Sequence, residues 1–411
     1  MSIPASATVL ASAPRTEPRR LSRTAAFYLQ ASIILLFLAG SSAPTAIYAL
    51  YQTAWGFSPI TVTAVFAIYA LAVLAALLVT GGLSDYVGRR PVLQVATLLQ
   101  ALAMLLFATA QGVGALLVAR VVQGLSTGAA AGAVGAGMLD LDRDKGTVAN
   151  AVGPMLGTAT GALLSGLMVA FLPAPTVLVY VVLGVLFLAQ AAGVAVLPET
   201  VTPRPGALAS LRPRFHLPAR ARGPMLLAVP ALVAAWALVG FYGSLGPTLV
   251  RRLLGSTSPV LGGLLLTTMA AAGALTVFLT RAWSPRAMTL LGTSMLMAGV
   301  VVSLGAVGHS AVGLLFVGTA VAGAGFGASF QGAIRGVVLL AAPHERAGLL
   351  SVLYVVAYLA FGAPAVLAGI GVVHGGGLLV TTREYGLAVI ALAGAALLGT
   401  LLRRAEAVKT L

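Results

Sequence analysis

The stretch 81–90, GGLSDYVGRR, places a short polar turn between two long apolar segments. The runs 60–80 and 92–110 flank it, and each is long enough to cross a bilayer, which takes about 20 apolar residues in a helix. The basic unit of the chain is therefore a short polar hinge between two membrane spans.

The hinge has the residues of a tight, charged turn. Three glycines favour a turn with positive φ, namely Gly81, Gly82 and Gly88. The carboxylate of Asp85 can accept backbone N–H bonds or pair with Arg89 and Arg90. On residue chemistry alone, one interpretation is simply a positively charged turn on the cytoplasmic side of a membrane.

The composition of the chain lies far outside that of soluble globular proteins. Its 411 residues are 59% hydrophobic and 8% charged, with a mean hydropathy of +1.03. The net charge of +15 does not indicate nucleic acid binding, because the basic residues are not gathered on a soluble domain. The absence of cysteine excludes thiolate metal sites, and the four histidines fall in separate loops. We expect an integral membrane protein without metal, cofactor or nucleic acid partner.

Apolar runs of spanning length recur through the sequence and predict an all-α protein with twelve transmembrane helices. They cover residues 27–50, 59–81, 92–110, 113–138, 147–171, 176–197, 225–249, 259–280, 287–308, 311–340, 347–371 and 384–402. The long hydrophilic connection 198–224 divides them six and six. We therefore predict a tail at 1–26, an N-terminal bundle at 27–198, a basic linker at 199–224, a C-terminal bundle at 225–403 and a tail at 404–411.

The basic residues indicate how the chain is oriented. If the N-terminus is inside, 20 of the 24 arginines and lysines fall in cytoplasmic segments. Such a bias predicts that both termini are cytoplasmic. The linker carries five arginines and several prolines, which suits a segment that lies on the anionic lipids of the inner leaflet.

The two halves of the sequence echo each other. Residues 152–166, VGPMLGTATGALLSG, have a counterpart in 361–371, FGAPAVLAGIG, and each segment carries a proline among small residues. The loop 281–286 keeps basic residues where the first half has the hinge 81–90, but it lacks the acid. Two related six-helix halves are typical of secondary transporters that work by a rocking motion.

The spacing Gly81-x3-Asp85-x2-Gly88-Arg89-Arg90 closely resembles the signature loop between helices 2 and 3 of the major facilitator superfamily. The segments 197–200, LPET, and 343–348, PHERAG, resemble further loops of that family, so the resemblance covers essentially the whole chain. The chain is most similar to the bacterial twelve-helix drug-exporter branch. The resemblance implies two pseudo-symmetric six-helix bundles that move by alternating access.

In that family the loop latches the two halves together on the cytoplasmic side when the transporter faces outward. The resemblance therefore implies a gating role for the hinge residues, namely Gly81, Asp85, Gly88, Arg89 and Arg90. This chain differs at Tyr86, where the family usually has Arg or Lys. The latch accordingly lacks one of its usual charges.

Arg120 is a charge within a predicted span. It is the eighth residue of the run 113–138, so it lies roughly 10 Å inside the membrane boundary at 1.5 Å per residue. Such a charge is costly and usually functional, although snorkelling to the outer headgroups is the simpler alternative. The segment Arg120-x2-Gln123-Gly124 resembles the helix 4 motif of the family, which implies that Arg120 faces the central cavity and takes part in proton or substrate coupling.

This arginine has no obvious counter-ion, because none of the nine acidic residues lies in the middle of a span. Backbone carbonyls, Gln or Ser oxygens, water or the substrate itself must then satisfy its guanidinium. The planar, permanently charged fork suits a carboxylate or phosphate and repels a cation. We expect a bound substrate that is neutral or anionic, with protons exchanging on a substrate acid or on Asp85.

Span 5 carries a further motif. The run Asn150-x2-Gly153-Pro154-x2-Gly157 resembles the segment that marks antiporters in the family, in which small residues control an occlusion gate. Small residues at this spacing are also ordinary helix-packing surfaces. Several polar groups within spans are candidate cavity residues or could instead satisfy the backbone: Gln30, Tyr48, Arg120, Gln123, Asn150, Gln331 and Tyr358.

The leading prediction is proton-coupled export of a small drug-like or metabolite molecule by rocking of 1–198 against 225–411 in the bacterial cytoplasmic membrane. No nucleotide-binding loop occurs, so an ion gradient must supply the energy. Uptake or facilitated passage of a small organic anion is the alternative that Arg120 suggests. A polytopic membrane enzyme or receptor is weaker, because no catalytic constellation is found. We expect a monomer that contacts membrane lipids and is not an enzyme.

Overall fold

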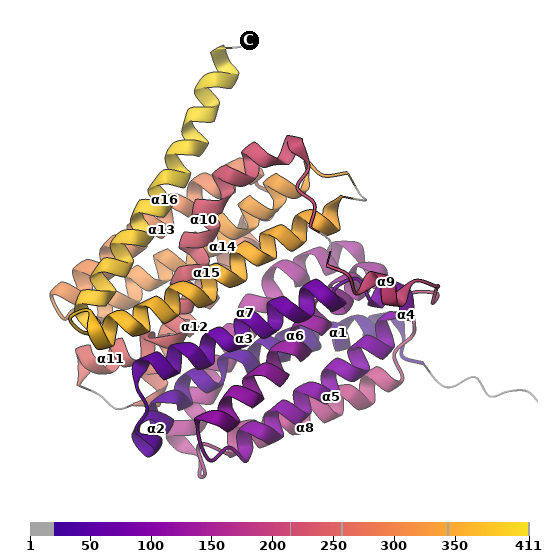
Figure 1. Ribbon diagram of the computed structural model, residues 1–411, viewed down its shortest axis with the longest axis horizontal. Helices are drawn as coiled ribbons and strands as arrows, with labels where there is room; N and C mark the ends of the chain where they lie inside the picture. Colours follow the sequence, from indigo (N-terminus) through magenta and orange to yellow (C-terminus); the bar gives the residue numbers. More distant parts are fainter. Residues whose placement is uncertain (1–19, 214, 256–257, 343–344, 410–411) are drawn as a thin grey trace, which may run out of the picture.

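The structure, a computed structural model, describes residues 20–213, 215–255, 258–342 and 345–409. Within these ranges every regular element is an α-helix, and 12 spans are long and apolar enough to cross a membrane. They form two groups, drawn from indigo to magenta and from red to yellow in Figure 1. The predicted twelve-helix fold with two bundles is thus confirmed. Most of the N-terminal tail and two residues of the segment 343–348 lie outside the described residues.

The N-terminal bundle contains the first six spans. These are α1 with α2 (Arg23–Ser42 and Pro44–Trp55), α3 (Pro59–Thr80), α5 (Arg89–Ala108), α6 (Val113–Leu141), α7 (Arg143–Phe171) and α8 (Leu178–Ala195). Serine begins several helices, because its hydroxyl oxygen accepts an amide hydrogen of the first turn. Ser22 does so for α1 and Ser58 for α3.

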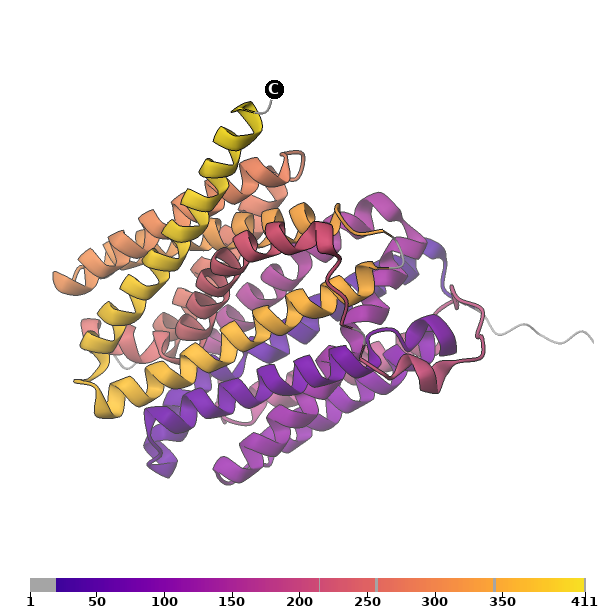
Figure 2. The same ribbon diagram turned by 45° about the horizontal axis from the view of Figure 1, so that its top comes forward.

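The C-terminal bundle contains the other six. These are α10 (Ala219–Ser244), α12 (Pro259–Leu279), α13 (Pro285–Gly308), α14 (Val312–Val338), α15 (Arg346–His374) and α16 (Leu378–Lys409). Three short helices connect spans, namely α4 (Ser84–Val87), α9 (Ala207–Ser210) and α11 (Gly246–Leu254). Helix α16 projects beyond the other helices in both views (Figures 1 and 2).

Prolines interrupt the first span of each half, where the sequence predicts unbroken helices. Helix α1 gives way to α2 at Pro44, and α10 gives way to α11 next to Pro247. A proline has no amide hydrogen and its ring crowds the preceding turn, so the helix cannot continue unchanged. Helices α2 and α11 then each end at a glycine in the left-handed region, Gly56 (φ 63°) for α2 and Gly255 (φ 62°) for α11. The first span of each bundle is thus interrupted in the same way.

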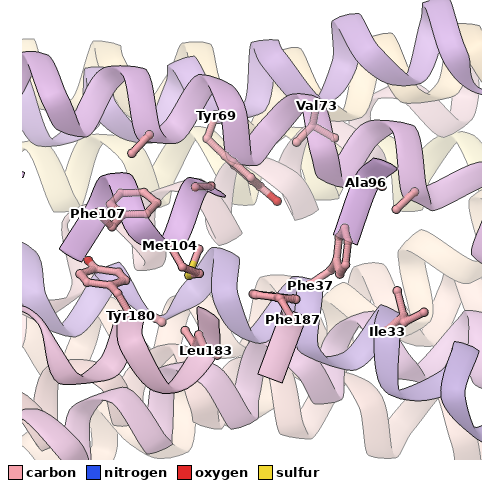
Figure 3. Packing of buried hydrophobic residues seen from close by; sticks show 14 of the residues in the cluster. Ile33, Phe37, Tyr69, Val73, Ala96, Met104, Phe107, Tyr180, Leu183 and Phe187 are labelled. Atoms are coloured by element: carbon pink, nitrogen blue, oxygen red, sulfur yellow. The ribbon is translucent and has the colours of Figure 1, made fainter. Parts of the chain in front are cut away.

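Aromatic rings fill the core of the N-terminal bundle (Figure 3). Phe107 stacks on Tyr180 with ring centroids 4.9 Å apart, and Phe37 meets Phe187 edge to face at 5.4 Å. These rings come from α5, α8 and α1, so they hold three helices together. Small residues bring other helices closer, since a Cβ on Gly128 of α6 would lie 2.3 Å from a carbonyl oxygen of α3.

The path of the chain defines two faces of the molecule. We call the side with residues 84–89, 199–213 and 281–285 the basic face. We call the side with residues 56–58, 172–177 and 309–311 the opposite face. The two bundles meet where α3 packs on α15 and where α7 packs on α12.

The close contacts between the bundles lie from the middle of the molecule toward the opposite face. Thr267 of α12 donates a hydrogen bond to the carbonyl oxygen of Ala159 in α7, at 3.2 Å. Gly369 of α15 approaches α3 so closely that a Cβ there would lie 2.3 Å from Oγ1 of Thr63. These contacts join the bundles on the side of the opposite face.

Candidate functional site

Arg120 lies on α6 and is completely buried inside the N-terminal bundle. Its Nε donates to the hydroxyl of Tyr48 at 2.8 Å, and the second Nη contacts the same oxygen. The first Nη donates to Oε1 of Gln123 at 2.7 Å and to the carbonyl oxygen of Ser41 at 3.0 Å. Uncharged oxygen atoms from the broken first span and from α6 itself therefore hold the charge.

Four aromatic rings enclose this guanidinium. Its Cζ lies between 5.2 and 5.9 Å from the ring centroids of Tyr48, Phe66, Tyr69 and Phe107. Ring faces at such distances stabilise a cation away from water. Two of the rings, Tyr69 and Phe107, belong to the core seen in Figure 3. The structure thus places Arg120 in the interior of one bundle, behind aromatic side chains.

The broken first span explains why polar side chains are needed at this depth. In an unbroken helix the carbonyl of Gly40 would accept a hydrogen bond from residue 44, but Pro44 has no N–H. Gln123 Nε2 donates to that carbonyl oxygen instead, at 2.9 Å. Arg120 bonds the neighbouring carbonyl, so both side chains satisfy backbone groups that would otherwise be buried alone.

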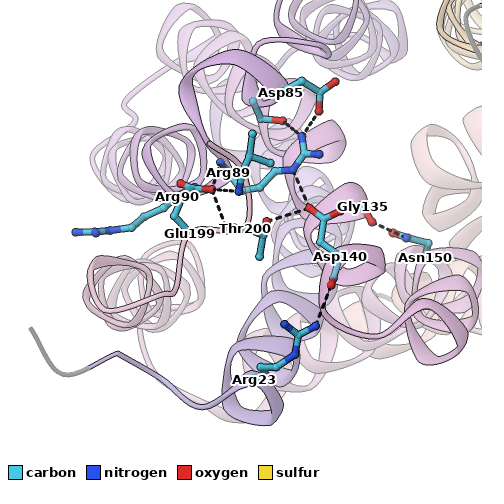
Figure 4. A network of polar contacts seen from close by, with 11 residues as sticks. Arg23, Asp85, Arg89, Arg90, Gly135, Asp140, Asn150, Glu199 and Thr200 are labelled. Carbon is cyan, nitrogen blue, oxygen red and sulfur yellow. Dashed lines mark hydrogen bonds and ion pairs between the residues drawn. The ribbon is translucent and has the colours of Figure 1, made fainter. Parts of the chain in front are cut away.

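A second polar cluster lies at the basic face, around the hinge (Figure 4). Arg89 forms ion pairs with Asp85 and with Asp140, the latter from Nε to Oδ2 at 3.3 Å. Its Nη1 also donates to Oγ of Ser84 at 2.7 Å. Asp140 in turn accepts a hydrogen bond from the hydroxyl of Thr200 at 2.9 Å. The cluster therefore joins α4, α5, the end of α6 and the beginning of the linker.

The structure corrects two expectations about the hinge. The side chain of Arg90 points away from the cluster in Figure 4, so Asp85 pairs with Arg89 and not with both arginines. Positive φ was expected at three glycines, but only Gly88 adopts it, at 101°. Gly81 has φ −57° because its N–H still bonds the carbonyl of Leu77 and continues the turn of α3.

Glu199 completes this cluster, although the sequence suggested only a family-like ending for span 6. Its carboxylate accepts the amide hydrogens of Arg89 at 2.8 Å and Arg90 at 3.0 Å. Pro91 follows without an N–H, so these are the amides that the start of α5 leaves unpaired. Gly88 leaves the necessary room, since a Cβ there would lie 2.5 Å from Oε2 of Glu199. Helix α5 has no Ser, Thr, Asn or Asp at its N-cap position. In the sequence, this was the signal that an acid from another segment would cap the helix.

The linker covers Tyr86, the position at which the hinge departs from its family pattern. Cζ of Arg204 lies 4.6 Å from the centroid of the Tyr86 ring. The amide of Arg204 also donates to the carbonyl oxygen of Tyr86, at 2.9 Å. The linker thus brings a positive charge to the site where the family usually has a basic residue.

The small residues of span 5 bring α7 against α1. A Cβ on Gly157 would lie 2.3 Å from a carbonyl oxygen of α1, and one on Gly153 would lie 3.1 Å from a side chain of that helix. Helix α7 runs through Pro154 without interruption. Asn150 Nδ2 donates to the carbonyl oxygen of Gly135 at 2.9 Å and so ties α7 to α6 (Figure 4).

An aromatic cluster of the C-terminal bundle lies where the two bundles meet. The ring of Trp236 in α10 lies 5.2 Å from Phe330, 5.5 Å from Tyr358 and 5.9 Å from Phe361, between centroids. Trp236 and Tyr358 also pack against the core of the N-terminal bundle. Trp236 Nε1 is buried and has no hydrogen-bond partner among the described residues. The centre of the molecule therefore offers apolar rings and one unpaired donor.

The remaining predicted cavity residues lie apart from one another. Gln30 is buried against Gly137 of α6, and its Oε1 has no hydrogen-bond partner in the described part of the chain. Gln331 is half-buried and follows Phe330 of the aromatic cluster directly. The structure groups Tyr48, Arg120 and Gln123, whereas Asn150 and Tyr358 belong to other contacts. No three His, Cys, Asp or Glu side chains of the described ranges are grouped as metal ligands.

Comparison with known proteins identifies the family that has this architecture. A sequence profile of the Major Facilitator Superfamily matches residues 31–348. The chain belongs to the major facilitator superfamily. Its members are secondary transporters of small molecules and not enzymes. No curated protein is significantly similar to this transporter in sequence.

Solved structures share the fold of this transporter. One is a bacterial homolog of the human lysosomal transporter Spinster in an inward-facing, unoccupied conformation, with TM-score 0.71, 14% identity, and coverage of 92% of this chain and 97% of that chain. Another is the nucleoside transporter NupG, with TM-score 0.66, 12% identity, and coverage of 93% and 98%. At these identities the similarity shows the fold alone. It does not single out the drug-exporter branch expected from the sequence.

Proposed function

We propose that this transporter exports small, uncharged amphipathic molecules by alternating access. The observation that carries the proposal is the aromatic cluster around Trp236 at the junction of the bundles, with its unpaired indole N–H. Rings bind apolar surface, and a single buried donor favours a substrate with an acceptor oxygen or nitrogen. NupG, which shares the fold, is a nucleoside transporter, and a nucleoside is a molecule of that uncharged, partly aromatic kind.

The proposed direction depends on the orientation of the chain. Most arginines and lysines outside the spans lie at the basic face, and the rule that positive loops stay inside makes this face cytoplasmic. Both termini are then cytoplasmic, in a bacterial inner membrane, and the protein works as a monomer. The bundles are joined from the middle of the molecule toward the opposite face, which would then be the outer one, as expected of the state that releases substrate to the cytoplasm or takes it up from there.

We assign proton coupling, if protons drive transport, to the cluster at the basic face. The acids that the structure describes lie near the ends of spans and not in their middles. Asp85 and Asp140 share Arg89, so protonating either acid would weaken an ion pair there. Proton binding would thereby loosen the hinge and the linker that covers it.

Uptake of a small organic anion is the second candidate. The observation in its favour is that the partners of Arg120 are uncharged, so the N-terminal bundle retains a net positive charge in its interior. An anion that reached this region would be attracted over a long distance, because apolar surroundings screen charge weakly. The aromatic rings around Arg120 argue against direct contact in this state.

Transport in proteoliposomes with an imposed pH gradient tests both candidates. Uncharged aromatic compounds and organic anions would be supplied separately, and the direction of net movement recorded for each. The variant Trp236→Phe keeps the ring and removes the N–H, so it should raise the apparent KM for an accepted substrate about tenfold, the value of one buried hydrogen bond. Trp283→Phe is the control, because Trp283 is 47% exposed and lies outside the cluster. Transport of anions alone, unchanged by Trp236→Phe, would contradict the proposal and favour uptake.

A further inference from the structure

A cavity lies between the two bundles near the opposite face, away from the sites described above. Its volume is about 100 Å³, and α2 of the N-terminal bundle forms one wall with Ala49, Leu50 and Thr53. The other wall comes from α11 and the beginning of α12, including Arg251 and Pro259. One water molecule needs roughly 10–15 Å³ of such space, so the cavity has room for a small ion with water.

Arg251 is the one charged side chain among the described residues that line this cavity. It lies in the last turn of α11, where one Nη is 3.4 Å from Oγ1 of Thr248. Its Nε is buried and has no hydrogen-bond partner among the described residues. Burial lowers the pKa of the Arg251 guanidinium, as expected for a desolvated cation without a nearby acid.

The neighbouring Arg252 shows that this burial is not required by the helix. A cation in the last turn of a helix is stabilised by the helix dipole, and both arginines gain from that position. Arg252 does so while exposed to solvent. The dipole therefore explains a positive charge on α11, but it does not explain why Nε of Arg251 is buried in the cavity wall.

We propose that this cavity binds a small oxyanion, a carboxylate or a phosphate, through Arg251. Carboxylates and phosphates suit the planar fork of a guanidinium, and among the described residues Arg251 has Thr248 as its one hydrogen-bond partner. Thr53 lines the same cavity, but its hydroxyl donates to the carbonyl oxygen of Ala49 at 3.1 Å, so Arg251 is the donor that faces the anion. The first turn of α12, which borders the cavity at Pro259, adds positive potential.

An anion bound here affects the conformational cycle, because its site has walls from both bundles. When the bundles separate at the opposite face, α2 moves away from α11 and the site is divided. The anion therefore binds the state joined at that face more tightly than the other state, and it shifts the population toward the joined state. This device is independent of the transported substrate and of the orientation proposed above.

The experiment uses inorganic phosphate and the full chain. Thermal unfolding in detergent is followed with and without 10 mM phosphate, at constant ionic strength set with a non-coordinating salt. We expect phosphate to raise the melting temperature of the wild type by about 1–3 °C. Arg251→Gln should abolish this increase. Arg252→Gln, the exposed neighbour, should retain it.

A second readout reports the separation of the bundles. The chain has no native cysteine, so spin labels can be attached at Gln111→Cys and His309→Cys, which are exposed in loops of the two bundles at the opposite face. Phosphate should increase the short-distance population about twofold relative to the long one, and Arg251→Gln should cancel the change. Discs of phosphatidylcholine with and without phosphatidylglycerol, with no free phosphate added, show whether an anionic lipid headgroup occupies the site in place of free phosphate. No stabilisation of the wild type, or equal stabilisation of Arg251→Gln, overturns the proposal.

Discussion

Arg120 shows how a charge is kept inside a membrane bundle by groups other than a carboxylate. Its hydrogen bonds go to Tyr48, Ser41 and Gln123, and aromatic faces surround it. Each partner is itself a polar group that would be costly to bury alone. The arginine and its partners therefore depend on one another, whatever further role Arg120 has in coupling.

Replacing Arg120 should consequently affect stability as well as transport. Arg120→Ala leaves a hydroxyl, an amide oxygen and a carbonyl without their donor, and we expect a loss of about 3–5 kcal/mol of unfolding free energy. Arg120→Lys keeps the charge but not the fork, so the loss should be smaller and transport impaired but present. Denaturant unfolding of the purified protein checks this, with Arg252→Ala as the exposed control expected to change stability by less than about 0.5 kcal/mol. If Arg120→Ala has wild-type stability and fully transports a permanently cationic dye, Arg120 has neither the structural role nor the role in transport.

Glu199 offers a second test at this scale. Glu199→Gln keeps the shape of the side chain but removes the charge that faces the start of α5, so the two amides of Arg89 and Arg90 lose a charged acceptor. We expect a loss of about 1 kcal/mol in unfolding free energy, measured as a lower melting temperature. Glu384→Gln, at an exposed acid near the opposite face, should change little. An unchanged melting temperature in Glu199→Gln would mean that the cap is dispensable.

At the scale of elements, glycine decides how closely helices approach. Helix α7 can lie against α1 only because Gly157 has no Cβ, which would otherwise meet a carbonyl oxygen at 2.3 Å. A backbone contact of this kind cannot be relieved by a rotamer change, so the helices themselves would have to move. This surface packs α7 against α1 in the structure, and it serves gating if the contact changes during transport.

Substitutions in α7 and α13 should therefore have opposite effects. Gly157→Ala should destabilise the protein and impair transport, and the larger Gly157→Leu should prevent occlusion. Gly305→Ala on α13 should be neutral or stabilising by up to about 1 kcal/mol, because nothing lies within 4 Å of that position and alanine favours a helix. Melting temperatures and proteoliposome transport of the matched pair check this. Normal coupling in Gly157→Leu would leave the span 5 glycines with packing alone.

For the whole molecule, the hinge bears on the balance between conformational states. In the structure Asp85 pairs with Arg89 inside the N-terminal bundle while the bundles are joined at the opposite face. If Asp85 latches the bundles at the basic face in the other state, its removal should favour the state seen here. The shift in population depends on how differently Asp85 stabilises the two states, and not on its contact in one of them.

Asp85→Asn should thus be expressed normally, transport more slowly, and show a larger short-distance population between labels at Gln111→Cys and His309→Cys. The control is Asp144→Asn, which removes an exposed acid of the same face. It should leave both the transport rate and the distance distribution unchanged. Identical behaviour of Asp85→Asn and the wild type would remove the latch from the mechanism.

The sequence determined the number of spans, their division into two halves and the polar character of the hinge. These properties are local, because a bilayer selects apolar segments of a given length and a charged turn must stay outside it. Proline removes an amide hydrogen wherever it occurs, but it does not by itself show where a span breaks, because α1 ends before Pro44 whereas α7 continues through Pro154.

Tertiary structure alone decided which polar groups meet. Tyr48 is 72 residues from Arg120, and Glu199 is 110 residues from Arg89. A buried donor in a membrane must find an acceptor, but the requirement can be met by any oxygen that packing brings within reach. The sequence could therefore show that Arg120 needs partners and that α5 needs a cap. The residues that fill these roles follow from helix packing, which depends on shape across the whole bundle and not on spacing along the chain.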